Sequence, residues 1–125
     1  MADDLVPDDL RDFVLRHIDS VAQLEALLLL RANPHDEWDV AKTTKRLYAA
    51  EQEVVEILGR LCADGLLSCH ETGYRYAPQT PELQALIDRL AAFYARHLIP
   101  ITNMIHTKPR RIREFADAFR FRKDR

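Results

Sequence analysis

Residues 39–78 read DVAKTTKRLYAAEQEVVEILGRLCADGLLSCHETGYRYAP, and this stretch decides the fold that we expect. Apolar residues at helical spacing predict one helix over about 40–48 and a second over about 51–64. Gly65 is expected to end the second helix, since glycine is favoured just after a helix. Alternating residues then predict two short strands, over 66–71 and 74–77, joined by a tight turn. The stretch is therefore expected to form two helices followed by a β-hairpin.

The flanking sequence predicts more helices, which the hairpin needs because an isolated hairpin is marginal in water. One short helix should begin at Pro7 and end near His17, and a buried helix should follow the cap Ser20. A long helix should begin at Pro81 and be interrupted at Pro100, with a shorter helical pattern beyond it. Residues 36–39 are expected to form a turn or a very short strand.

The expected fold is mainly α with a small two- or three-stranded β wing. Residues 1–78 should form a winged helix domain with an N-terminal helix, and 79–107 a long dimerisation helix with a kinked continuation. Residues 108–125 should form a basic amphipathic tail helix. We expect one hydrophobic core, which includes Leu24, Leu27, Leu28, Leu47, Val55, Leu58, Leu61, Leu67 and Tyr76.

Roughly residues 20–78, about half of the chain, resemble the winged helix-turn-helix of bacterial regulators of the MarR-like and ArsR-like kind. The most specific part is VVEILGRLCADGLL, residues 54–67. The resemblance implies a dimeric, cytoplasmic transcriptional regulator that binds double-stranded DNA. The long helix that starts at Pro81 resembles the dimerisation helices of those regulators, so we expect a homodimer through Leu83, Leu86, Ile87, Leu90, Tyr94 and Leu98.

The resemblance also places the second helix of residues 39–78 in the major groove of DNA. The residues expected to contact the duplex are Lys42, Lys45, Arg46, Gln52, Arg60 and Arg75. Glu51, Glu53 and Glu56 depart from this pattern, because they would face the phosphates and be repelled. An alternative hypothesis is therefore an interaction module that has lost DNA binding and uses this acidic helix and the basic tail to bind proteins.

Charge is distributed unevenly along the chain. Residues 1–40 contain ten acidic and three basic residues, a net charge of −7, whereas residues 108–125 contain eight basic and three acidic residues, a net charge of +5. The tail, with its arginines Arg110, Arg111 and Arg113, has three open interpretations. In the first the tail presents arginines to DNA, in the second it lies on anionic lipid, and in the third it contacts the acidic N-terminal segment of a second subunit.

Several other functions are not indicated by the sequence. The histidines are scattered, zinc-binding spacing is lacking, and no P-loop, GxSxG or HExxH motif occurs, so we expect neither an enzyme nor a bound metal or cofactor. No apolar run approaches the ~20 residues of a membrane span, so membrane insertion is not expected. Cys62 and Cys69 lack CxxC spacing, which suits a reducing cytoplasm, and Cys62 is expected to be a small core residue.

Overall fold

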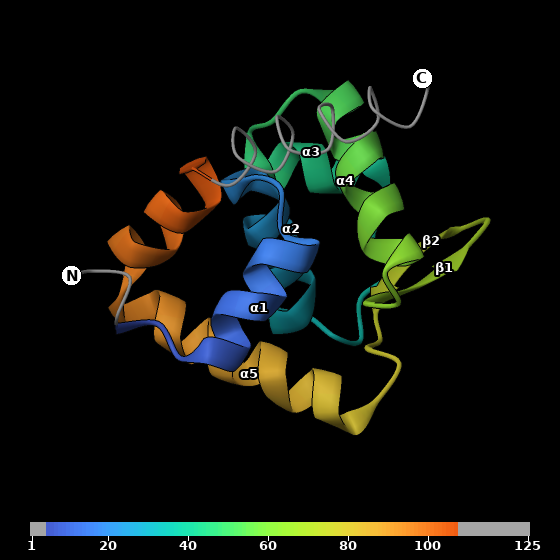
Figure 1. Ribbon diagram of the computed structural model, residues 1–125. Coiled ribbons are helices and arrows are strands. Elements are labelled where there is room, and N and C mark those ends of the chain that lie inside the picture. Colours follow the sequence, from blue (N-terminus) through green and yellow to red (C-terminus); the bar gives the residue numbers. More distant parts are fainter. Residues whose placement is uncertain (1–4, 108–125) are drawn as a thin grey trace, which may run out of the picture.

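The computed structural model describes residues 5–107, which are mainly helical with a small two-stranded antiparallel sheet (Figure 1). Residues 98–107 are also helical. The predicted tail helix, including Arg110, Arg111 and Arg113, lies outside the described residues. The other elements, in chain order, are α1 (Asp8–His17), α2 (Val21–Ala32), α3 (Val40–Leu47), α4 (Glu51–Ala63), β1 (Leu67–His70), β2 (Gly73–Tyr76) and α5 (Pro81–Arg96).

Polar caps fix where three of these helices begin. The side-chain oxygens of Ser20, Asp39 and Thr80 accept hydrogen bonds from backbone N–H groups three residues further on, at 3.1, 2.7 and 3.0 Å. Each bond satisfies a backbone donor that has no partner within its helix. The predicted starts at Ser20 and Thr80-Pro81 are therefore confirmed.

The break after α5 does not lie where it was predicted. The chain leaves the helix at His97 and resumes a helical path at residue 98, so Pro100 falls in the first turn of the new helix. Proline is tolerated in a first turn, because the N–H group that it lacks would have no partner there. The predicted interruption is confirmed, but it lies at His97, three residues before Pro100, because Pro100 has no N–H group to donate to the Arg96 carbonyl oxygen. The shorter helical pattern beyond it is also confirmed.

The β-hairpin, which we call the wing (residues 67–76), is held to the helices by Trp38. In the wing Cys69 pairs with Tyr74. Trp38 and Tyr74 exchange two backbone hydrogen bonds of 2.8 and 2.7 Å, so one residue of the 36–39 segment extends the sheet. Gly73 allows this approach, since a Cβ atom there would lie 2.6 Å from the Trp38 carbonyl oxygen.

The core surrounds α2, and most of its predicted members are confirmed. Val55 is the exception, because it is 49% exposed. The inward face of α4 is instead set by Val54, which continues the spacing of Leu58 and Leu61. The buried predicted residues are Leu24, Leu27, Leu58, Leu61 and Leu67, and those partly buried against the core are Leu28, Leu47 and Tyr76.

Helix α5 buries its apolar face within the same chain. Ile87 and Leu90 are fully buried and Tyr94 is nearly so, because α5 packs against α1. An ion pair between Asp9 and Arg89 joins the two helices, and the hydrogen bond from Arg89 lowers the pKa of the Asp9 carboxyl.

The structure therefore corrects part of the predicted dimer contact. Ile87, Leu90 and Tyr94 are not accessible to a second chain, because α1 of the same chain covers this face. Leu83 and Leu86 are half-buried, and Leu98 is 49% exposed. These three residues remain accessible for an association of two chains.

Tyr76 carries a pH-dependent contribution to stability. Its hydroxyl is buried without a hydrogen-bond partner, and burial, followed by the Asp88 charge, raises its pKa to about 12. In the unfolded chain the phenol ionises near pH 10. The unfolded state therefore loses this proton at a lower pH than the folded state. The contribution of Tyr76 to the free energy of unfolding is constant below about pH 10 and is lost as the pH rises towards 12.

We expect Tyr76→Phe to be as stable as the native protein, or slightly more stable, at pH 8, since no hydrogen bond is lost. Between pH 10 and 12 the variant should lose less stability than the native protein. Urea unfolding measures the free energy of unfolding of both proteins at pH 8 and pH 11. The other titrating groups are the same in the two proteins, so their effect cancels when the two losses are compared. An equal loss in both proteins would contradict the assignment.

Candidate interaction surface on α4 and the wing

Helix α4 is apolar on two sides. Its outward side carries Val55, Gly59, Cys62 and Ala63, which are spaced so that they share one face of the helix. Val55, Gly59 and Ala63 are exposed and Cys62 is half-buried. We call these four residues the outer stripe. Scattered single apolar residues on a surface are ordinary, but a continuous apolar stripe beside a second element indicates a contact site.

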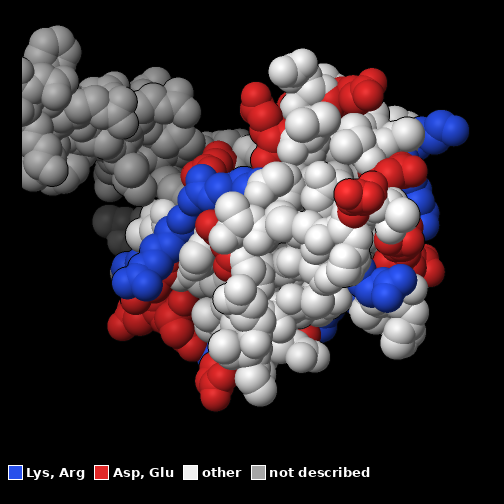
Figure 2. Space-filling view, turned by 90° about the vertical axis from the view of Figure 1, so that its right-hand side faces the viewer, with Lys and Arg blue, Asp and Glu red and all other residues white. Residues whose placement is uncertain are grey.

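The molecule is largely uncharged where this stripe meets the wing. Figure 2 shows the side formed by α4 and the wing, with a broad uncharged area at its centre and acidic side chains around much of its rim. Lys and Arg side chains lie at the edges of this view. The exposed acids of α4 are Glu51, Glu53 and Glu56. The electrostatic character of this side is therefore neutral to acidic.

Arg60, the one cation on α4, is held by its own chain. Its guanidinium donates hydrogen bonds to Asp19 at 2.7 Å, to Asp64 at 3.1 Å and to the Arg16 carbonyl oxygen at 3.1 Å. Leaving these partners for a DNA phosphate would break three hydrogen bonds, two of them to carboxylates. The predicted role of Arg60 in DNA contact is therefore not supported by its surroundings.

The remaining predicted DNA contacts divide into separate groups. Lys42, Lys45 and Arg46 are exposed on α3, with the Lys42 ammonium 4.2 Å from the centre of the Trp38 ring. Gln52 is exposed on α4, and Arg75 is exposed on β2. The structure therefore brings together the three cations of α3, whereas the surface of α4 between them and Arg75 carries acids.

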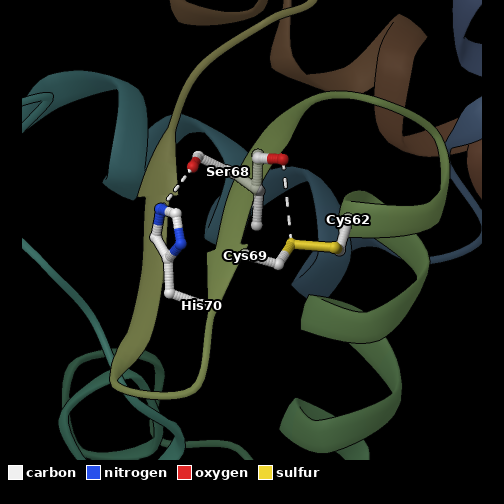
Figure 3. The surroundings of a disulfide bond; sticks show 5 residues. Cys62, Ser68, Cys69 and His70 are labelled. Carbon is white, nitrogen blue, oxygen red and sulfur yellow. Dashed lines mark hydrogen bonds between the residues drawn. A yellow bond between two sulfur atoms is a disulfide. The ribbon is translucent and has the colours of Figure 1, made fainter.

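A disulfide bond joins the outer stripe to the wing, which the sequence reasoning missed. Cys62 of α4 and Cys69 of β1 are bonded, with their Cα atoms 6.2 Å apart (Figure 3). Both residues are half-buried, so the expectation that Cys62 is a reduced core residue is wrong. Ser68 and His70, which flank Cys69, hydrogen-bond to each other at 2.8 Å on the other side of the strand (Figure 3).

Tyr48, in the turn between α3 and α4, is the second feature that the sequence reasoning missed. It is 95% exposed and has a φ of 56°, in the left-handed region that favours glycine. Its N–H group donates to the Thr44 carbonyl oxygen at 2.9 Å and ends α3. A glycine or asparagine at this position would have signalled such a turn, whereas a tyrosine gives no such signal.

Residues 5–107 contain no cluster of three or more His, Cys, Asp or Glu side chains that could hold a metal ion. In that part of the chain, the helices also lack the length and apolar character that crossing a bilayer requires. Comparisons with models of protein families, with curated proteins and with solved structures gave no match.

Proposed function

We propose that the protein is a winged-helix interaction module that binds another protein through the outer stripe of α4 and the adjacent wing. The observation that carries the proposal is the neutral to acidic character of this side of the molecule (Figure 2). In the winged-helix regulators that residues 20–78 resemble, the second helix of the motif is the one that enters DNA. Here that helix offers Val55, Gly59 and Ala63 among glutamates, and its arginine is engaged by carboxylates.

The same features define the chemistry of the partner. A small apolar side chain or helix face would cover the stripe, since Gly59 has open space where a Cβ atom would stand. Lysines or arginines around that contact would meet Glu53 and Glu56, which gives the contact its charge complementarity. We also propose the cytoplasm as the location, where the cysteine pair described above would be exposed to reducing conditions.

We expect a photo-reactive amino acid at position 55 of the disulfide-bonded protein to crosslink one discrete partner in an extract of the host cell that contains no added reductant. The matched control is position 85 on α5, where an exposed alanine lies away from the stripe. Glu53→Lys together with Glu56→Lys should lower the yield of the adduct at position 55 by roughly tenfold, because two attractions become repulsions. Denaturing gels and mass spectrometry measure the adducts. Equal adducts at positions 55 and 85, or a yield that the lysines do not change, would contradict the proposal.

DNA binding is a second candidate, favoured by one observation. Lys45 and Arg46 are exposed beside Tyr48, whose aromatic ring projects almost fully into solvent. Cations next to an exposed aromatic residue are suited to phosphate contact and stacking. Such binding would use α3 and the turn rather than α4, and it would carry little sequence information because these residues are not placed to read several base edges.

We expect any affinity for a DNA duplex to fall steeply with salt concentration. Lys45→Ala should weaken binding equally for unrelated duplexes and lower the slope of log affinity against log salt by about one. Arg96→Ala, which removes an exposed cation from α5, is the control and should leave both unchanged. Fluorescence anisotropy with two unrelated duplexes measures these quantities. No binding at low salt, or an equal effect of the control, would eliminate this candidate.

A further inference from the structure

The disulfide between Cys62 and Cys69 lies within the surface assigned to the partner. One cysteine belongs to the outer stripe of α4 and the other to the strand that borders it (Figure 3). The bond therefore fixes the position of β1 relative to α4. The partner contact depends on that position, since the stripe and the wing together form the uncharged side.

The wing has other attachments that do not involve the cysteines. At its base, the Leu66 N–H group donates to the Leu61 carbonyl oxygen at 3.1 Å, and the Ala77 N–H group donates to the Leu66 carbonyl oxygen at 3.2 Å. On its far side, Trp38 pairs with Tyr74. Breaking the disulfide would leave these contacts in place. The fold should therefore survive reduction, while the edge of the wing that faces α4 is released.

The surroundings of the bond suit exchange with a thiol. Both cysteines are only partly buried, so the pair is not sealed within the core. Disulfides that are accessible are more often labile or regulatory than those sealed in a core. In a reducing compartment a disulfide that forms is usually transient and redox-sensing.

We propose that Cys62 and Cys69 form a redox switch that controls binding at the surface of α4 and the wing. The oxidised pair holds the stripe and the wing as one continuous surface, which binds the partner. Reduction separates the two elements and weakens binding. This inference rests on the proposed function for its outcome, but the structural change in the wing is independent of any partner.

The chemical step is thiol–disulfide exchange with a dithiol reductant. A thiolate of the reductant attacks one sulfur of the pair, the bond between Cys62 and Cys69 breaks, and the second cysteine leaves as a thiolate that takes up a proton. The second thiol of the reductant then attacks the mixed disulfide and releases the remaining cysteine. Two electrons pass to the protein, and the reductant becomes a disulfide. Exchange with an oxidised small disulfide reverses the reaction.

Amide hydrogen exchange tests the structural change in the full chain without a partner. After treatment with dithiothreitol, we expect exchange in residues 67–72, which are β1 and the turn after it, to become about tenfold faster, while α2 exchanges as before. The variant Cys62→Ser/Cys69→Ser should show the fast pattern with or without dithiothreitol. Unchanged exchange in residues 67–72 after mass spectrometry has shown complete reduction would overturn the switch.

The photo-crosslink at position 55 tests the consequence for binding. We expect the yield to fall at least fivefold when the protein is reduced, and to be equally low in the double serine variant under either condition. An equal yield from oxidised and reduced protein would overturn the switch but leave the proposed function standing. No adduct in either state would overturn the proposed function, whereas the exchange measurement would still decide whether reduction releases the wing.

Discussion

Replacing Leu90 with Asp is expected to destabilise the protein severely. Leu90 is fully buried where α5 packs against α1, so the substitution removes a core side chain and places a carboxyl group there without a partner. The expected loss is at least about 4 kcal/mol, which is a large part of the stability of an ordinary domain. Far-ultraviolet circular dichroism and urea unfolding measure it.

Ala92→Asp is the control, because Ala92 lies on the same helix and is exposed. It should remain folded and lose less than about 1 kcal/mol, because Asp has a lower helix propensity than Ala but meets no packing at an exposed position. The pair of variants also separates two roles for this face of α5. If Leu90→Asp kept its full stability and only halved the mass of a dimer in solution, then Leu90 would lie between subunits, and the packing of α5 on α1 would be wrong.

Replacing Leu58 with Ala is expected to cost about 2–5 kcal/mol, the range for a buried leucine in a packed core. Leu58 is fully buried on the inward face of α4. Val55→Ala, three residues earlier and half-exposed, should change the free energy of unfolding by less than about 0.5 kcal/mol. Urea titrations of the two variants measure both values. A larger loss from Val55→Ala than from Leu58→Ala would mean that α4 is rotated and that the outer stripe faces the core.

The helices and the hairpin were predictable because their signals are local. A capping residue, a glycine after a helix or a tight turn depends only on its neighbours in sequence. Val55 was misplaced because it and Val54 are adjacent valines, and either one can continue an apolar pattern at helical spacing. Only packing against α2 decides which of the two turns inward. The packing of α1 over the apolar face of α5 was not predicted for a similar reason, since this contact joins two helices that are far apart in the sequence.

The candidate surface was harder to predict than the fold. The glutamates of α4 were correctly expected on an exposed side of that helix, but two of the three partners of Arg60 come from α1 and the segment before α2, far away in the sequence. The link between Cys62 and Cys69 requires the chain to turn back after α4, which a spacing of seven residues does not reveal. Tyr48 has a backbone conformation that its residue type does not suggest.

The burial of Trp38 has a practical consequence. It is the sole tryptophan in the sequence, it is 1% exposed, and its backbone pairs with the wing. Its fluorescence thus reports on one place in the molecule, without a label and without a background from other indoles. Release of the wing only on the α4 side should leave the emission spectrum unchanged, whereas detachment from Trp38 should shift it to longer wavelengths as water reaches the ring. Emission recorded during reduction therefore distinguishes a wing that is released only from α4 from a wing that has also detached from Trp38.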